Sequence, residues 1–224
     1  MEIKKAKSQK QKLQRVNSIL EAAEALFTEN QASELPSAIQ IANKAGVAKG
    51  TLYIYFSTKE AIFLALLERH TQNWIADFES QLRQYESVTV NDICQYLANY
   101  WQKTPAMGEL NRMADALLIN NVEEKIYSSF QTKIINDLKR IVPSVKSLNT
   151  DVESSQWLEL ILQSQQLLTL AWQNANPRHA RASKQIKTFD MLSTNLLTPF
   201  WTNLVELKKE KPKEKSTWRK LLGN

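Results

Sequence analysis

The sequence predicts an all-α protein, and three observations support that prediction. The 224 residues include only four glycines and six prolines, although tight hairpins between strands rely on glycine. Alanine, leucine, glutamate, lysine and glutamine, which favour helices, are abundant. Apolar residues recur at intervals of three and four along most of the chain, as they do on the buried face of a helix. With 43% hydrophobic residues, these helices can bury a sizeable core.

The first helix is expected at about residues 10–30, followed by a short second helix at 37–44. The apolar stripe of the first helix consists of Leu13, Val16, Ile19, Leu20, Ala23, Leu26 and Phe27. Pro36 suits the first turn of the second helix, because its missing N–H would have no partner there. Gly46 ends the second helix, since glycine readily adopts the left-handed conformation that follows many helices.

A third helix is expected at about 48–55, and a fourth begins near residue 57 and continues to about residue 84. Ser57 and Glu60 have the spacing of a capping box, and Thr58 is the alternative cap for the fourth helix.

Five further helices are expected in the remainder of the chain. They cover about 90–103, 105–119, 122–141, 151–174 and 182–208. Pro143 and the pair Asn176-Pro177 should stop helices, and Pro199 should kink or break the last one.

Positive charge is concentrated at the two ends of the chain. Residues 1–15 contain six Lys or Arg and one acid, residues 208–224 contain seven and two, and residues 61–207 contain 13 basic and 15 acidic residues. A basic end suits a polyanion such as DNA or an anionic membrane, and a solvated tail is the alternative. We favour the solvated, disordered tail for 208–224 and a DNA-contacting arm before the first helix for residues 1–7.

The chain has one cysteine, Cys94, which excludes an internal disulfide and suits a reducing cytoplasm. The charged N-terminus lacks the apolar stretch of a signal peptide. No run approaches the roughly 18 consecutive apolar residues of a membrane span. We therefore expect a cytoplasmic protein with no membrane partner.

The stretch 41–60, which reads IANKAGVAKGTLYIYFSTKE, carries the clearest functional signal. Gly46 lies where two short helices must turn sharply, as in a helix-turn-helix. Gly50 lies inside the third helix, where glycine costs roughly 1 kcal/mol relative to alanine. Close approach of the backbone to another molecule is a physical reason for it. Leu52 and Phe56 are four residues apart and should share the inward face.

The remaining residues of this third helix have the chemistry of a DNA reader. Lys49 can donate to guanine O6 and N7, and Thr51 can contact a thymine methyl group. The hydroxyls of Tyr53 and Tyr55 can reach phosphates. Lys59 lies in the first turn of the fourth helix, where free N–H groups bind anions, so the two together form a phosphate clamp. The alternative is that these lysines and tyrosines are ordinary surface side chains.

Three segments resemble the TetR family of bacterial transcriptional regulators. They read ILEAAEALFTEN, IANKAGV and AKGTLYIYFSTKEAIFLALL, and the resemblance covers about residues 10–67. It implies a helical fold in which helices two and three read DNA, and a C-terminal domain that binds a small-molecule effector and dimerises through its last two helices. The residues that the resemblance places against DNA are Ser37, Lys49, Gly50, Thr51, Tyr53, Tyr55 and Lys59.

The resemblance divides the chain into three parts. Residues 1–60 form the basic arm and three-helix DNA-binding domain, 61–207 a larger helical domain for effector binding and dimerisation, and 208–224 a charged tail. Two positions depart from the family pattern: Asn30-Gln31 replaces the usual glycine after the first helix, and Ser37-Ala38 replaces the usual Thr-Val opening of the second. These departures concern a phosphate contact and not the fold.

No catalytic or metal site is expected, so the protein should be neither an enzyme nor the holder of a cofactor. His70 and His179 are far apart and have no partner at metal-ligand spacing. Cys94 has no nearby histidine, and the chain contains no glycine-rich phosphate loop.

Aromatic and methionine residues cluster in the middle of the chain instead. One interpretation is an apolar effector pocket between helices, and plain core is the alternative, which we favour for any single member. The pocket candidates are Trp101, Met107, Met113, Phe130, Trp157 and Trp172, with Tyr96 and Tyr100 in the same group.

Residues 151–174 and 182–207 are apolar on one face and are expected to pair across a two-fold axis in a homodimer. Such a dimer places two recognition helices about 34–36 Å apart, at half-sites one turn of DNA apart. The expected function is a ligand-responsive transcriptional regulator that binds double-stranded operator DNA, a repressor released by a small hydrophobic effector. The alternatives are an activator of the same fold, a helical module that binds a membrane or a protein, and an all-helical enzyme.

Overall fold

The computed structural model describes residues 2–30, 34–84, 89–146, 152–177 and 188–206. Every regular element within these ranges is helical, which confirms the all-α prediction. The helices are α1 (Glu2–Glu29), α2 (Ala38–Lys44), α3 (Lys49–Tyr55), α4 (Lys59–Gln84), α5 (Val90–Lys103), α6 (Pro105–Met113), α7 (Glu124–Lys146), α8 (Ser154–Ala175) and α9 (Phe189–Glu206).

Three sequence predictions lie outside the described residues. They concern the first residues of the last helix at 182–187, His179 and the charged tail at 208–224. Among the described residues, no helix combines the length and the apolar character that a membrane crossing requires.

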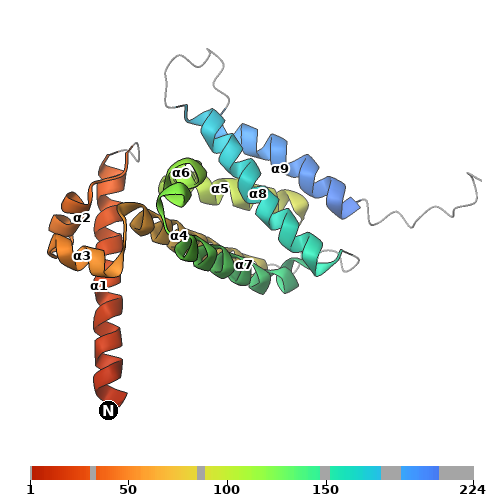
Figure 1. Cartoon of the computed structure of the whole chain (residues 1–224). Helices are drawn as coiled ribbons and strands as arrows, with labels where there is room; N and C mark the ends of the chain where they lie inside the picture. Colours follow the sequence, from red (N-terminus) through yellow and green to blue (C-terminus); the bar gives the residue numbers. More distant parts are fainter. Residues whose placement is uncertain (1, 31–33, 85–88, 147–151, 178–187, 207–224) are drawn as a thin grey trace, which may run out of the picture.

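α1 begins earlier than expected. The sequence predicted a separate basic arm before a helix that starts near Lys10, but α1 already begins at Glu2. The reason is local, because residues 2–10 contain no glycine or proline and consist largely of good helix formers such as Lys, Ala and Gln. Figure 1 shows the N-terminal half of α1 projecting past α2 and α3, away from the rest of the chain.

Two prolines expected to end or distort helices lie inside continuous ones. Pro143 does not stop α7, which continues to Lys146. Pro199 does not break α9, which runs from Phe189 to Glu206. Buried residues on both sides of each proline account for this, namely Val142 and Val145 in α7 and Leu197 and Trp201 in α9. Asn176 does end α8, as expected.

The expected helix at 105–119 is also shorter than predicted. Its regular α-helical part ends at Met113, and a π-helical turn (Ala114–Leu118) and a 3-10 turn (Ile119–Asn121) follow. These turns lead the chain into α7.

The described side chains form two hydrophobic cores, and α4 contributes to both. The N-terminal half of α4 packs with α1, α2 and α3 through residues such as Phe63 and Leu67. Its C-terminal half packs with α5, α7, α8 and α9 through Trp74 and Phe78. A rigid 26-residue helix therefore joins the two parts of the molecule.

The second core is a bundle that is open along one edge. α7 packs against α4 and α8, and α9 packs against α8 and α5, whereas α4 and α5 make few contacts with each other. α5 contributes the single cysteine, Cys94, which is fully buried. Burial raises the pKa of its thiol to about 11.

α6 lies close against α8 because Gly108 has no side chain. A Cβ at Gly108 would lie 2.4 Å from Trp172. The Trp172 Nε1–H donates to Glu109 Oε1 at 2.9 Å, and Glu109 also pairs with Arg112 of its own helix. This contact fixes α6 between the two cores.

Candidate DNA-binding surface and ligand cleft

α2 is held at its start by a capping box. The Ser37 Oγ accepts from the Gln40 N–H at 3.3 Å, and the Gln40 Oε1 accepts from the Ser37 N–H at 2.9 Å. Pro36 precedes this cap and is not in the first helical turn, where the sequence analysis placed it, and it is buried. The exposed Ser37 side chain therefore lies at the N-terminal edge of α2, where its hydroxyl also donates to Gln40 Oε1 at 2.8 Å.

The turn between α2 and α3 depends on Gly46, as predicted. Gly46 has a φ of +65°, and the next residue, Val47, donates its N–H to the Ala42 carbonyl at 3.0 Å. Residues with a Cβ rarely adopt this φ. Ile41 of α2 and Leu52 of α3 are both fully buried, so the two helices are fixed against the core and α3 presents its other face to solvent.

The outward face of α3 carries most of the expected DNA-contacting residues. Lys49, Gly50 and Tyr53 are exposed, and the Lys49 Nζ lies 6.0 Å from the centre of the Tyr53 ring. α3 contains no acidic residue. Thr51 and Tyr55 are half-buried, so this surface offers less of them.

Gly50 is not required by the packing of the protein. A Cβ built at this position meets no atom within 4 Å. An alanine would therefore fit the fold and favour the helix. The absence of a side chain at Gly50 therefore leaves space on the outer surface of α3, where a bound molecule can approach the backbone.

Lys59 lies in the first turn of α4, and its Nζ is 3.8 Å from a carboxylate oxygen of Glu60. The cap of α4 is Thr58, the alternative considered from the sequence, because its Oγ1 accepts from the Ala61 N–H at 3.1 Å. The same hydroxyl donates to the Asn121 carbonyl at 3.2 Å. The start of α4 is thus tied to the turn after α6 while Lys59 remains 41% exposed.

Two exposed apolar residues of α2 and α3 were not predicted from the sequence. Ile54 of α3 is 80% exposed and Ile39 of α2 is 53% exposed. The signal for Ile54 was present, since it lies two residues from both inward-facing Leu52 and Phe56 and so must point outward. An isoleucine there offers an apolar contact surface, which suits the methyl group of thymine.

The six expected effector residues do not line one cavity. Trp101, Met107, Trp157 and Trp172 are buried in the second core. Met113 and Phe130 instead pack with the N-terminal core. Phe130 lines a small cavity of about 380 Å³ beside Tyr55 and Phe56, and none of the six lines the larger cleft described next.

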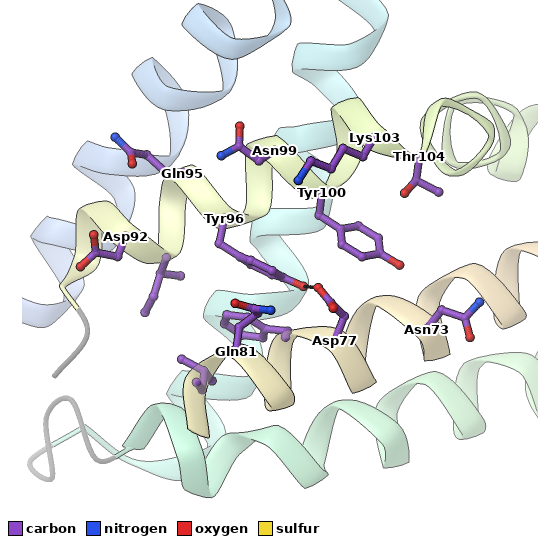
Figure 2. Close-up of a pocket in the computed structure, with 13 residues that line it drawn as sticks. Asn73, Asp77, Gln81, Asp92, Gln95, Tyr96, Asn99, Tyr100, Lys103 and Thr104 are labelled. Atoms are coloured by element: carbon purple, nitrogen blue, oxygen red, sulfur yellow. Dashed lines mark hydrogen bonds between the residues drawn. The ribbon is translucent and has the colours of Figure 1, made fainter. Parts of the chain in front are cut away.

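A larger cleft of about 830 Å³ lies between α4 and α5, along the open edge of the bundle (Figure 2). Its walls are aromatic rings, amides, hydroxyls and a few charged groups. They are contributed by Asn73, Asp77, Phe78, Gln81, Leu82, Asp92, Ile93, Gln95, Tyr96, Asn99, Tyr100, Lys103 and Thr104. Tyr96 and Tyr100 were part of the aromatic group noted in the sequence, but the acid and amides were not.

Asp77 of α4 and Tyr96 of α5 connect the two walls of the cleft. The Tyr96 hydroxyl donates to Asp77 Oδ2 at 2.7 Å (Figure 2). Burial, together with the Asp77 carboxylate, raises the pKa of Tyr96 far above its usual range, and burial also raises that of Tyr100. Both phenols are therefore neutral at any pH at which the protein works.

A helix-turn-helix with an exposed third helix, joined through α4 to a larger helical domain with a ligand-sized cleft, defines the class of ligand-responsive DNA-binding regulators. The description of bacterial regulatory proteins of the tetR family matches residues 19–66, and that of the tetracyclin repressor-like C-terminal domain matches residues 68–193. The chain belongs to the TetR family of bacterial transcriptional regulators, as the resemblance implied, and it is a regulator and not an enzyme.

Solved structures share this fold at low sequence identity. The fatty acid degradation regulator FadR from Bacillus halodurans is 17% identical with a TM-score of 0.54, covering 88% of this chain and 97% of that one. FadR from Bacillus subtilis, solved in complex with stearoyl-CoA, is 18% identical with a TM-score of 0.52 over 84% and 96%. A TetR-family regulator from Mesorhizobium loti MAFF303099 is 14% identical with a TM-score of 0.54 over 88% and 97%. No curated protein matches the sequence.

Proposed function

We propose that this protein is a cytoplasmic repressor that binds operator DNA as a homodimer and is released by a small hydrophobic effector. The observation that carries the proposal is the outward face of α3. Lys49, Gly50, Tyr53 and Ile54 are exposed there on a helix whose other face is fixed in the core. A short helix with this face free can enter the major groove of duplex DNA.

The remaining expected contacts flank this face and suit phosphates. Ser37 lies at the start of α2 and Lys59 at the start of α4. Both positions combine a helix N-terminus with a polar or basic side chain, which is the chemistry that binds a phosphate. In this proposal Thr51 and Tyr55 support the contact from half-buried positions, and residues 1–60 act as the DNA-binding domain.

The dimer is assigned to the segments 151–174 and 182–207, as far as α8 and α9 describe them. The two helices pack against each other (Figure 1) and still leave apolar side chains exposed, including Leu170 at 48% and Met191 at 43%. Pairing of these helices with those of a second copy would bury them in a four-helix interface. Residues 61–207 would then bind the effector and form the dimer.

Selection of binding sites from random duplexes, followed by anisotropy titrations at several salt concentrations, tests the proposal. Lys59→Ala should lower the slope of log K against log salt by about 0.9 and keep the sequence preference, as loss of one phosphate contact does. Lys49→Ala should relax the preference at a guanine, because it removes a base contact. Lys139→Ala, which removes the same charge from the exposed face of α7, is the control. A wild-type protein that enriches no sequence would contradict the proposal.

A further inference from the structure

We propose that the cleft between α4 and α5 binds an organic cation with an apolar body, with Asp77 as its counter-ion. The naming of this ligand as the effector rests on the proposed function, whereas binding in the cleft does not. Three features carry the inference: the size of the cleft, the absence of a cationic partner for Asp77 among the described residues, and the row of aromatic rings beside it.

The cleft has the size and position of a small-molecule site. Its volume of about 830 Å³ lies within the range of about 300–1,000 Å³ that such sites occupy. Asn73, Asp77 and Gln81 recur every four residues and line one face of α4, and α5 faces them across the gap (Figure 2). Within the described residues, α4 and α5 meet mainly through Phe78, Asp77 and Tyr96, and the cleft lies beside these contacts.

Asp77 is the carboxylate in the cleft that remains available to a ligand. Its Oδ2 accepts from Tyr96, and no Lys or Arg forms an ion pair with it within the described part of the chain. Asp92 is already engaged, because it closes the capping box of α5 with Thr89, whose hydroxyl lowers the pKa of the Asp92 carboxyl. The Tyr96 hydroxyl orients Asp77 without neutralising its charge.

Aromatic rings form a continuous row beside this carboxylate. The ring centroid of Phe78 lies 5.8 Å from that of Trp74 and 5.0 Å from that of Tyr96, and both pairs are stacked. The ring centroids of Tyr96 and Tyr100 are 6.1 Å apart. Trp74 and Phe78 are buried behind this row, whereas Tyr96 and Tyr100 are partly exposed at the cleft, and the faces of such rings attract cations and apolar groups alike. The phenol of Tyr100 adds a hydrogen-bond donor without adding negative charge.

Lys103 is the one cation among the residues that line the cleft, and its position has a structural explanation. It lies in the last turn of α5, where a positive charge is stabilised by the helix dipole. Asp77 lies in the middle of α4 and caps no helix. The hydrogen bond from Tyr96 leaves the charge of Asp77 without a cationic partner among the described residues, which points to a cationic ligand rather than an anionic one.

Isothermal titration of the full-length protein with decyltrimethylammonium, below its micelle concentration, tests the inference without DNA. We expect saturable binding with one site per chain and at least a tenfold loss of affinity in Asp77→Asn. That variant keeps an acceptor for Tyr96. Asp115→Asn, which removes an exposed acid outside the cleft, is the matched control and should bind as the wild type does. Lys103→Gln should bind the cation equally well or more tightly.

The opposite sign of charge provides the outcomes that overturn the inference. Decanoate has the same apolar chain with a negative head, and stearoyl-CoA is the ligand in the Bacillus subtilis FadR structure. Binding of either one that Lys103→Gln abolishes would assign the cleft to an anion. Cation affinity that is unchanged in Asp77→Asn would place the cation elsewhere. Cation binding by a protein that binds no DNA would support the cleft and refute the proposed function, so the two failures are distinguishable.

Discussion

Gly50 lies in a helix with open space around the position of a Cβ, so its effects on stability and on DNA binding can be separated. We predict that Gly50→Ala raises the free energy of unfolding by about 1 kcal/mol, because alanine favours the helix. The same variant should bind operator DNA at least about tenfold more weakly, a loss of about 1.4 kcal/mol, because the methyl group occupies the surface that approaches DNA. Urea unfolding and anisotropy titrations measure the two effects.

Gly46→Ala is the matched control for this variant. Gly46 has a φ of +65°, and a side chain in that conformation costs roughly 1–2 kcal/mol. Gly46→Ala should therefore destabilise the protein.

A Gly50→Ala protein that is more stable and still binds DNA with full affinity would contradict a close approach of DNA to the backbone at Gly50.

Ile54 is the second residue whose exposure calls for a partner, since 80% of it is open to solvent. We predict that it contacts a thymine methyl group. Replacement of that thymine by uracil in the selected duplex should weaken wild-type binding by about 0.8 kcal/mol, the value of one buried methyl-sized group. Ile54→Ala should bind the two duplexes equally. Wild-type protein that is insensitive to uracil at every thymine would exclude the contact.

Single residues were predictable where the chain itself determines their environment. Leu52 and Phe56 point inward as expected, since their helical spacing relates them to the same face. Asp77 and Tyr96 were not predictable as a pair, because they are 19 residues apart and meet only through the packing of α4 and α5. The sequence contains no local pattern that states which helices leave a gap between them.

Helices were predictable where short-range signals mark their ends. α5 has the expected bounds, and α2 and α3 each begin one residue after the predicted start. The predictions failed where packing overrode local preference, as at Pro143 and Pro199, which lie between buried neighbours in continuous helices. The start of α1 was missed for the opposite reason, because its charged sequence lacks an apolar stripe while retaining helix-forming residues.

The contact between α1 and α4 includes an ion-pair cluster that makes stability depend on pH. In this cluster Glu24 of α1 faces two residues of α4: its Oε1 lies 3.0 Å from His70 Nε2, and its Oε2 lies 2.5 Å from Arg69 Nη2. His70 and Arg69 lower the pKa of the Glu24 carboxyl. A carboxylate with a lowered pKa stabilises the fold fully above its ordinary value of 4.5, and this contribution is lost as the pH falls through the lowered value.

We predict that Glu24→Gln destabilises the protein by about 0.5–1 kcal/mol at pH 7, since the cluster is partly screened by solvent. The difference from wild type should shrink as the pH falls below 4.5, the ordinary value for this carboxyl. Thermal unfolding at a series of pH values measures this. Glu21→Gln, which removes an exposed acid from α1 outside this cluster, is the comparison. A difference that is the same at pH 7 and pH 3 would contradict the role of the charge.

The sequence predicted a three-helix DNA-binding domain followed by a larger helical domain. It did not predict how α4 participates in two cores, or that the tryptophans would fill the second core and leave the cleft at its edge. Trp101 and Trp172 are 6.5 Å apart within that core. The position of a large ring depends on the space between neighbouring helices, and that space is determined by tertiary packing and not by local sequence.

We predict that α8 and α9 form the interface of a homodimer. We expect the double variant Leu170→Glu and Met191→Glu to sediment as a monomer, because buried charges oppose pairing of α8 and α9 with a second copy. Its operator affinity should fall by about 10²–10⁴-fold, because a monomer has one DNA-binding domain and no second, linked domain that binds the other half-site at a high effective concentration. Ile135→Glu, on α7 and 36% exposed, should remain dimeric. A double variant that sediments as a dimer would move the interface elsewhere.

Cys94 offers a practical route to the internal motions of this protein. Its thiol is buried within the second core, beside Thr198 of α9, and burial raises its pKa, so alkylating reagents can reach it only when α5 separates from that core. Because the chain has one cysteine, the rate at which it is alkylated reports how often this part of the core opens. A ligand bound between α4 and α5 should lower that rate, whereas a ligand bound at the DNA-binding domain should leave it unchanged.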